Sequence, residues 1–309
     1  MDDAKTGVPS TSPPSTSPTS AMPPMLLSAP LSAPKDLSHL RIMTFNVRYG
    51  TAKEDDVQNE WAHRRSRLAE CVLKHSPDIV GTQECLPFQA ADIEKDLGGQ
   101  YAYVGRDRDA SGRSEMAAIF FRRSEFRDIT SGTFWLSPTP YIPATKFWDS
   151  SLNRVVTWFR GTHAPSGRLL FLFNTHFDHF SYIARMESIK VLLNHTMALR
   201  EDESKKPIVA LIGDFNSPGE GSEEHRMVVG NGYRDLWNQV PPDRKTGPPG
   251  TFHAFCSVAD APKQRTRIDW ILLRRDADVW IDRIETSTFC VGGKYFPSDH
   301  FPVVADLLV

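Results

Sequence analysis

The stretch Arg41-Ile-Met-Thr-Phe-Asn46-Val-Arg48 is a short apolar run closed by polar side chains. A second stretch of the same kind is Leu170-Phe-Leu-Phe-Asn-Thr-His176-Phe-Asp178. Each is followed by a helical pattern and then by another apolar run closed by an acid. These following runs are Pro77-Asp-Ile-Val-Gly-Thr-Gln-Glu84 and Pro207-Ile-Val-Ala-Leu-Ile-Gly-Asp214-Phe-Asn216. Because a buried strand can present the residue at its end to a cleft, the chain is predicted to have two similar halves that pack together.

Packing of the two halves would bring their polar strand ends to one rim, namely Asn46, Glu84, His176, Asp214 and Asn216. Two later segments add to this set: Arg267-Ile-Asp269-Trp-Ile-Leu-Leu and Pro297-Ser-Asp299-His300. The predicted site is rich in carboxylate, amide and imidazole groups and contains no candidate covalent nucleophile. Hydrolysis of a phosphate ester needs a cation, a base for water, donors to the phosphoryl oxygens and stabilisation of the leaving group. The residue types therefore indicate a metal-assisted hydrolase of phosphate esters.

The remaining periodicity predicts the fold class. Apolar spacing predicts amphipathic helices over 61–75 and 182–199, and short apolar runs predict strands at 117–121, 133–136 and 155–159. Proline-rich loops are expected at 138–143 and 241–250. We predict an α/β protein built as a four-layer α/β/β/α sandwich, with two packed mixed β-sheets and helices on the outer faces.

Composition sets the domain limits. Residues 1–38 are built of Ser, Thr, Pro and Ala and are expected to form a disordered tail, so the folded domain is predicted to span 39–309. The formal net charge of the 309 residues is -2, which disfavours a protein devoted to gripping long duplex DNA. No apolar run is long enough for a transmembrane helix.

The cysteines fit no metal template. The four of them form no CxxC pair and match no zinc spacing. We expect a reduced intracellular protein, cytoplasmic or nuclear, with one disulfide left open as an alternative. Cys85, which follows Glu84, is interpreted as a small apolar residue beyond a strand end and not as a nucleophile. A monomer is expected.

The six motifs together resemble the endonuclease/exonuclease/phosphatase superfamily, which includes DNase I, abasic-site endonucleases, deadenylases and neutral sphingomyelinases. They occur in that family's order over residues 41 to about 305. The motifs are Thr44-Phe-Asn46-Val-Arg, Pro77-Asp-Ile-Val-Gly-Thr-Gln-Glu84, Asn174-Thr-His176-Phe-Asp178-His, Gly213-Asp214-Phe-Asn216-Ser, Arg267-Ile-Asp269-Trp-Ile and Ser298-Asp299-His300.

The resemblance implies a metal site and a group that activates water. Glu84 would be the principal ligand of Mg²⁺, for which Mn²⁺ could substitute, and Asn46 would help to hold that site. Asp299 would contribute to the metal shell, directly or through water. Asp214 would act as the general base or orient the water, and Asn216 would donate to a phosphate oxygen.

The resemblance also implies roles for two histidines. His300, oriented by Asp269, would contact or protonate the phosphate centre. Since a carboxylate favours the charged imidazole, the pKa of His300 is predicted to lie above its usual value. His176 would bind a non-bridging oxygen or assist the leaving group.

Weaker candidates surround this set. Arg113, Arg154 and Trp148 fall where related proteins place substrate-facing groups. For Arg154 a surface salt bridge is an equal alternative to phosphate binding, and for Trp148 packing is an alternative to stacking on a base. The arginines of Arg64-Arg65-Ser-Arg67 are interpreted as the solvated face of a helix, although the family carries a Trp-x-x-Arg pattern there.

The most favoured function is a metal-dependent phosphodiesterase or nuclease acting on single-stranded or short nucleic acid. The alternative is a phosphatase or phospholipase C-like hydrolase of a small phosphorylated metabolite or lipid headgroup. Asp269-Trp270 stands where inositol polyphosphate phosphatases carry Asp-Arg, which disfavours that substrate. A non-catalytic binding protein on the same fold is disfavoured because every expected acid is present.

Overall fold

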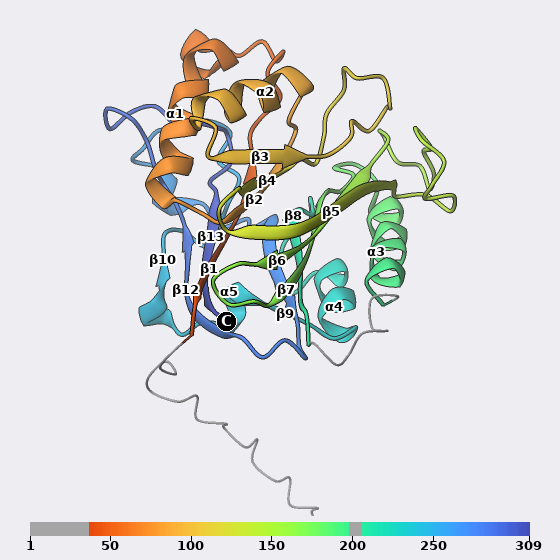
Figure 1. Ribbon diagram of the computed structural model, residues 1–309. Coiled ribbons are helices and arrows are strands. Elements are labelled where there is room, and N and C mark those ends of the chain that lie inside the picture. Colours follow the sequence, from red (N-terminus) through yellow and green to blue (C-terminus); the bar gives the residue numbers. More distant parts are fainter. Residues whose placement is uncertain (1–36, 198–205) are drawn as a thin grey trace, which may run out of the picture. The chain divides into compact units, whose positions relative to one another are not determined.

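The computed structural model describes residues 37–197 and 206–309, and two β-sheets form its centre (Figure 1). Within these residues, one sheet has seven strands in the order β10-β12-β13-β1-β2-β4-β3, and the other has six in the order β5-β6-β7-β8-β11-β9. The first sheet consists of β1 (His39–Asn46), β2 (Ile79–Gln83), β3 (Tyr101–Val104), β4 (Ile119–Arg122), β10 (Lys245–Thr246), β12 (Trp280–Thr286) and β13 (Val303–Leu308). The second consists of β5 (Phe126–Trp135), β6 (Val155–His163), β7 (Leu169–His176), β8 (Ile208–Asp214), β9 (Tyr233–Asp235) and β11 (Asp269–Arg274).

The helices lie outside the sheets. They are α1 (Trp61–His75), α2 (Pro87–Asp96), α3 (Tyr182–Met197), α4 (Glu223–Gly230) and α5 (Leu236–Gln239), with short 3-10 turns η1 (Val57–Asn59), η3 (Pro242–Arg244) and η4 (Ala261–Lys263). Alternation along the central strands explains the layers, because successive side chains of a strand point to opposite faces. Ile42 of β1 faces the second sheet, whereas Met43 packs in the cluster that includes α1. A third cluster joins α3 and α4 to the second sheet, which confirms the predicted four-layer arrangement.

Strand pairing brings the polar strand ends together. β1 and β2 are parallel with Asn46 opposite Gln83, and β7 and β8 are parallel with His176 opposite Asp214. Parallel strands end at the same edge of a sheet, so each half presents its polar end residues at one edge. β11 runs antiparallel to β8 and places Asp269 opposite Asp214.

The predicted elements are found with adjusted limits. The helix over 61–75 is confirmed, and the second helix begins at Tyr182 as expected and is described as far as Met197. The run at 133–136 is the end of the longer strand β5, and the loop at 241–250 includes η3 and the two-residue strand β10.

The predicted solvated arginine face on α1 is wrong for two of its three arginines. Arg64 and Arg67 are 1% and 6% exposed, whereas Arg65 lies at the surface with Asp92 and Asp96. Arg64 and Arg67 donate to backbone carbonyls instead of facing water. A guanidinium group can be buried when its fork of donors finds enough acceptors.

The predicted disordered tail, residues 1–38, lies almost entirely outside the residues that the structure describes. Ser38 is described, and it exchanges two backbone hydrogen bonds with Val309 at 3.1 and 2.9 Å, which extend the pairing of β1 with β13. Within 37–197 and 206–309, no helix has the length and apolarity needed to cross a membrane.

Candidate active site

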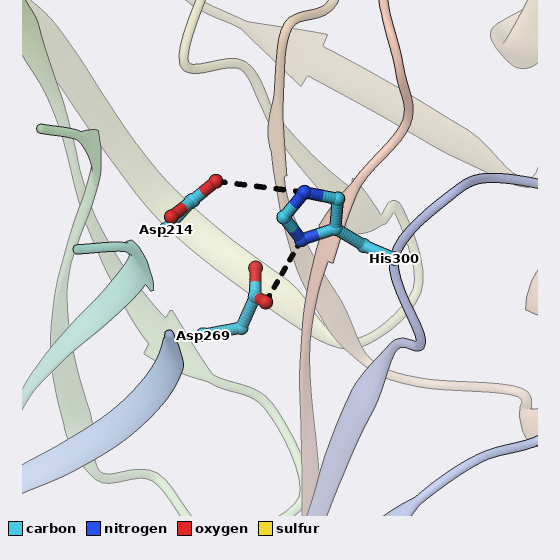
Figure 2. A group of neighbouring side chains, drawn as sticks. All are labelled: Asp214, Asp269 and His300. Carbon is cyan, nitrogen blue, oxygen red and sulfur yellow. Dashed lines mark hydrogen bonds and ion pairs between the residues drawn. The ribbon is translucent and has the colours of Figure 1, made fainter. Parts of the chain in front are cut away.

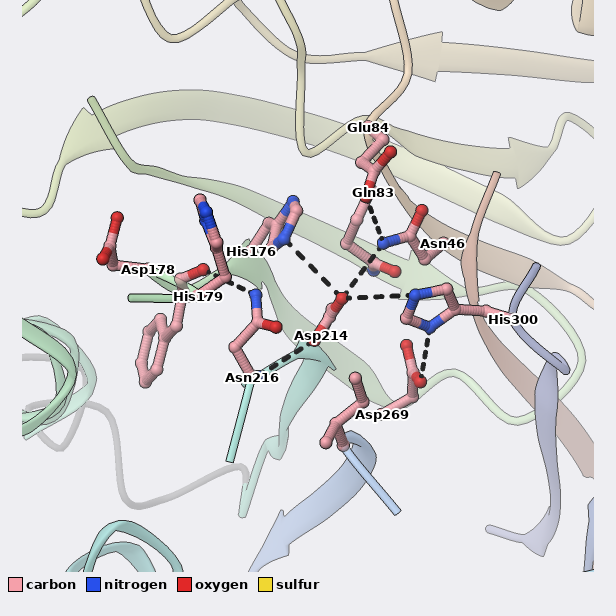
Figure 3. A network of polar contacts seen from close by, with 12 residues as sticks. Asn46, Gln83, Glu84, His176, Asp178, His179, Asp214, Asn216, Asp269 and His300 are labelled. Carbon is pink, nitrogen blue, oxygen red and sulfur yellow. Dashed lines mark hydrogen bonds and ion pairs between the residues drawn. The ribbon is translucent and has the colours of Figure 1, made fainter. Parts of the chain in front are cut away.

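A cavity of about 430 Å³ opens where the strand ends meet. It collects residues from both halves of the chain and from the segment before β13. The lining residues are Arg48, Tyr49, Glu84, Arg108, Glu115, Leu152, Arg154, His176, His179, Asp214, Asn216, Phe252, Ile268, Asp299 and His300. Figure 3 shows the polar network on this cavity and the strands from which it comes.

Three of the strand-end residues adopt a left-handed backbone. Arg48, Glu84 and Asn216 have φ angles of 54°, 58° and 47°. Each follows the end of a strand, and the left-handed turn redirects the chain at that point. Few non-glycine residues adopt this conformation, and such residues concentrate at functional sites.

Asn46 joins the two halves of the site. Its Nδ2 donates to Glu84 Oε1 and to Asp214 Oδ2, both at 3.0 Å (Figure 3). Its Oδ1 accepts the Arg48 backbone N–H at 3.0 Å, and the Tyr49 N–H donates to Glu84 Oε2 at 3.0 Å. Both oxygens of Glu84 are therefore oriented while the carboxylate still faces the cavity.

His300 lies between two acids (Figure 2). Its Nδ1 is 2.9 Å from Asp269 Oδ2, and its Nε2 is 3.8 Å from Asp214 Oδ2. Burial opposes the imidazolium, but the charge and hydrogen bond of Asp269 together with Asp214 raise the pKa of His300 to about 10. Burial and the charge of Asp269 raise the pKa of Asp214 to about 7, against the opposing effect of His300.

Two positions offer ligands for a divalent cation. The potential ligand atoms of Asp214, Asp269 and His300 lie within 4.8 Å of one another. A cationic His300 has no free lone pair for a metal, so this group is held together by the hydrogen bond to Asp269 and by ion pairs. Glu84 and Asp299 both line the cavity with carboxylate groups, and burial together with the charge of Glu84 raises the pKa of Asp299 against the opposing charge of His300. A cation between these oxygens would relieve that repulsion, so the residues present fit a hard divalent ion.

His176 and Asn216 complete the wall next to Asp214. His176 Nε2 is 3.6 Å from Asp214 Oδ2, and burial together with the charges of Arg154 and Arg108 holds the pKa of His176 well below its usual value. Its imidazole is therefore neutral at neutral pH. The Asn216 N–H donates to Asp214 Oδ1 at 2.9 Å, and its side-chain Nδ2 donates to the Phe177 carbonyl at 3.0 Å.

Arg154 brings a buried cation to the cavity. Only 4% of it is exposed, and its Nη2 lies 3.0 Å from His179 Nδ1. Its Nε is 3.6 Å from Asp178 Oδ2, and its Nη1 has no hydrogen-bond partner within the described residues. Such a donor is costly to leave unsatisfied, and an oxygen of water or of a ligand would satisfy it. The ion pair considered from the sequence is present, with Asp178 as the partner, but it is buried and not at the surface.

Asp178 itself organises the adjoining loop. It accepts hydrogen bonds from Ser151 N at 2.9 Å and Ser181 N at 2.8 Å, and from Ser150, Ser151 and Phe180 at 2.6–3.0 Å. Although burial opposes its charge, these bonds and the charge of Arg154 hold the pKa of Asp178 far below its usual range. Asp178 therefore links the loop before β6 to the start of α3 by hydrogen bonds.

The structure brings most of the predicted site residues together. Glu84, Asp299, Asp214, Asn216, His176, His300 and Arg154 line the cavity, and Asn46 and Asp269 contact lining residues directly. Arg113 is exposed, Trp148 is half-buried, and neither lines the cavity. Burial raises the pKa of Cys85 to about 12, in keeping with an inert thiol.

The sequence did not single out several lining residues, including Arg108 and Phe252, and it indicated Glu115 only through the weaker stretch Arg113-Ser-Glu115-Met. Arg108 holds Glu115 with a pair of contacts at 2.9 and 2.8 Å, across a loop with no motif. Phe252 is 40% exposed, and its ring centroid is 5.0 Å from that of His300. In the sequence, Arg108 and Glu115 appear only as opposite charges seven residues apart, which is a weak indication that they pair.

Comparison with known proteins identifies the family. The profile of the Endonuclease/Exonuclease/phosphatase family matches residues 43–300, and the chain belongs to this family. Members of this family are phosphoesterases that typically use divalent metal ions, and the chain has their hydrolase fold.

Several solved structures are similar. A mannosyl-6-phosphatase of Bacteroides thetaiotaomicron is 29% identical, with a TM-score of 0.78 over 87% of this chain and 100% of that chain. A family protein of Bacteroides vulgatus is 29% identical, with a TM-score of 0.76 over 87% of this chain and 98% of that one. TDP2 of D. rerio, solved with a single strand DNA product, is 21% identical and shares the fold, with a TM-score of 0.63 over 87% and 99% of the two chains. An uncharacterised protein of Acanthamoeba polyphaga mimivirus is 25% identical over 37% of this chain, and the match spans only 19% of that protein.

Proposed function

We propose that this chain is a divalent-metal-dependent phosphatase that hydrolyses phosphomonoesters of small polar molecules, with sugar phosphates as the first class to test. The single observation that carries the choice of monoester over diester is Arg154. A phosphomonoester has one more ionisable oxygen than a diester and carries more negative charge at neutral pH. A buried guanidinium with a free Nη1 is suited to this additional charge.

Two further observations support this choice. The cavity of about 430 Å³ is within the range that encloses a small ligand. The mannosyl-6-phosphatase covers 87% of the chain at 29% identity, above the similarity of the nucleic-acid-processing TDP2. The nuclease activity favoured from the sequence becomes the second candidate, supported by the shared catalytic motifs alone.

The metal would be held by Glu84 and Asp299, with Asn46 orienting Glu84. It would offset negative charge on the phosphoryl oxygens. Mg²⁺ is the proposed ion because the donors are oxygen atoms, and Mn²⁺ is a reasonable substitute.

The chain's own residues would carry the proton transfers and hold the phosphate. Asp214 is within reach of a water in the cavity and would orient it or accept its proton. His300, kept cationic by Asp269, would stabilise charge on the phosphoryl group, and Asn216 and neutral His176 would border the same space. A preorganised set of this kind stabilises developing charge without reorganisation at the moment of reaction.

A substrate panel with Mg²⁺ tests the proposal. Hexose 6-phosphates, glycerol 3-phosphate and p-nitrophenyl phosphate would be compared with bis-p-nitrophenyl phosphate, single-stranded RNA and DNA, and abasic duplex DNA. We expect kcat/KM for the best monoester to exceed that for every diester by at least about tenfold, given the value of a charge-assisted hydrogen bond. A higher kcat/KM on an oligonucleotide would instead establish the nuclease.

Arg154→Lys gives the matching test of the anion site. It keeps the charge but removes the planar fork, so kcat/KM for monoesters should fall by about ten- to a hundredfold, whereas diester cleavage should change little. Arg160→Lys is the control, since Arg160 lies on the same strand β6 with its guanidinium over Phe171, outside the cavity. An equal loss on both substrate classes would show that Arg154 does not recognise the monoester.

A further inference from the structure

Arg64 is a buried cation held almost entirely by backbone carbonyls. Its Nε donates to the Asn59 carbonyl at 2.9 Å, and its Nη1 to the Pro297 carbonyl at 3.3 Å. Its two Nη atoms also donate to the carbonyls of Val47 and Arg48. Its guanidinium lies 5.1 Å from the Trp61 ring centroid. The side chain therefore connects three separate segments of the chain through hydrogen bonds to their carbonyls.

One of these segments follows the residue that orients Glu84, and another leads to the proposed ligand Asp299. Val47 and Arg48 directly follow Asn46, which orients Glu84, and Pro297 lies two residues before Asp299. β1 and β13 pair only as far as Thr44 and Val303, so the pairing of these two strands does not itself tie Arg48 to Pro297. The hydrogen bond from Ser298 Oγ to the Asn46 carbonyl, at 2.7 Å, is a second tie between the same segments.

We propose that Arg64 is a positioning residue for the divalent cation. It sets the position of Asp299 relative to Asn46, which orients Glu84, by holding the backbones that follow Asn46 and precede Asp299. The inference rests on the proposed metal-dependent function and extends it to a side chain outside the cavity. Although burial lowers the pKa of Arg64 to about 10, it remains a cation at neutral pH. The charges of Asp299, Glu54 and Glu84 favour that cation, so these acids lie within its electrostatic reach.

Arg67 provides an internal control for this role. It lies one turn further along α1, is also buried, and also sits 5.1 Å from an aromatic ring centroid, that of Tyr295. Its donors reach the carbonyls of His63, Phe296 and Gln58. Arg67 therefore holds the segment before Asp299, as Arg64 does, but it does not hold the segment after Asn46. Arg64→Lys and Arg67→Lys thus remove similar forks, and only the first fork joins these two segments.

The experiment measures Mn²⁺ binding without substrate, by isothermal titration calorimetry on the full chain, with Tm and kcat/KM measured in parallel. Arg64→Lys should raise the Kd for Mn²⁺ by about tenfold or more, whereas Arg67→Lys should lower Tm comparably and leave the Kd within about twofold, because only Arg64 holds the segment after Asn46 to the segment before Asp299. High Mn²⁺ should restore kcat of Arg64→Lys most of the way to wild type, with the substrate KM unchanged. Equal Kd values for the two variants would overturn the inference.

Ser298→Ala provides a second test of the inference if Arg64→Lys does not fold. It removes the second tie, together with the 3.3 Å contact of the same hydroxyl group with Asp299 Oδ1, and the Kd for Mn²⁺ should rise several-fold without loss of folding. An unchanged Kd in Ser298→Ala, with an unfolded Arg64→Lys, would mean that the arginine serves stability alone. Absence of Mn²⁺ binding by the wild-type chain would instead overturn the proposed metal dependence, and with it this inference.

Discussion

Asp269 and His300 lie 31 positions apart in the chain, yet their side chains are 2.9 Å apart. We expect His300→Ala to lower kcat/KM roughly a hundred- to a thousandfold, because a preorganised cation is lost. This factor corresponds to a few kcal/mol of transition-state stabilisation. Asp269→Asn should reduce activity by disorienting the imidazole, and the double variant should be little worse than the more damaging single one. Measurement of kcat/KM for all four proteins, with Tm as a check on folding, decides this. Strictly additive losses would show that the two residues act independently.

Glu84 is expected to control metal affinity. Glu84→Gln preserves the shape and the acceptor that receives the Asn46 amide, but it removes the anionic charge. Activity and metal affinity should fall by on the order of a hundredfold or more. Titration of Mg²⁺ against turnover provides the measurement, and Glu115→Gln is the matched control for metal affinity, since Glu115 lines the same cavity but is already paired with Arg108. Near-normal turnover of Glu84→Gln at low Mg²⁺ would remove Glu84 from the ligand set.

Among individual residues, the sequence predicted those that belong to motifs and missed Arg108 and Phe252, which lie on loops without a motif. Glu84, Asp214 and His176 could be found because a polar group directly after an apolar run marks a strand end. Arg108 could not, because its place on the cavity depends on a loop between β3 and β4 with no motif. Arg64 was misassigned for another reason: arginine is rarely buried, and the carbonyls that accept its donors come from segments distant in sequence.

Gly213 determines how closely β8 can approach β7. Its φ is +144°, and an added Cβ would lie 2.0 Å from the Thr175 carbonyl oxygen on β7. Thr175 and Gly213 are paired in register, one step before His176 and Asp214. A residue with a side chain must therefore push the strands apart next to His176 and Asp214.

We expect Gly213→Ala to lower the free energy of unfolding by more than about 2 kcal/mol and to impair catalysis, because backbone strain and displacement combine there. Gly230→Ala is the control, since Gly230 ends α4 and has nothing within 4 Å of an added Cβ. It should leave stability unchanged or slightly raised. Urea unfolding of both variants provides the comparison, and similar stabilities would contradict the packing argument.

Helices and strands were predicted with unequal success for a physical reason. The helix over 61–75 has the expected limits because its apolar spacing repeats over four turns. The strand β5 is longer than predicted, because the residues of its first part are largely exposed and lack an apolar run. The pairing of β10 with β12 arises from tertiary contact between two short segments, which no local pattern encodes.

For the whole domain, Asp235 makes the free energy of unfolding depend on pH in the acid range. It is buried, accepts from His225 Nε2 at 2.8 Å, and forms an ion pair with Arg267. Burial opposes its charge, but His225 and Arg267 together hold the pKa of Asp235 below its usual value. The unfolded chain therefore takes up the proton first as the pH falls. The stabilisation from Asp235 is full above about pH 5 and is lost as the pH falls through the folded-state pKa.

Asp235→Asn should accordingly lower the free energy of unfolding at pH 7 by about 3 kcal/mol, as expected when one partner of a buried ion pair is removed. The difference from wild type should shrink below about pH 4. Asp276→Asn, which alters the largely exposed acid paired with Arg274, should have little effect at either pH. A difference that stays constant from pH 7 to pH 3 would show that Asp235 is not an ionised partner.

The two-halved architecture was predictable because both halves repeat the same order of apolar run, helical pattern and acid-closed run. Their face-to-face packing follows from strands whose two faces are both apolar. The choice between phosphomonoester and phosphodiester was not predictable, since it depends on the unpaired Nη1 of Arg154, and burial of that atom is a property of the assembled domain.

The left-handed backbone at Glu84 implies a trade-off between thermal stability and activity. A glutamate held at a φ of 58° is less stable there than asparagine would be, by roughly 1 kcal/mol. Glu84→Asn would relieve this strain but lose the hydrogen bonds that Glu84 accepts from Asn46 and Tyr49, so it should lower turnover far more than it changes Tm. Engineering campaigns that rank variants of this protein by Tm would then retain inactive sequences at position 84, unless turnover is scored at the same time.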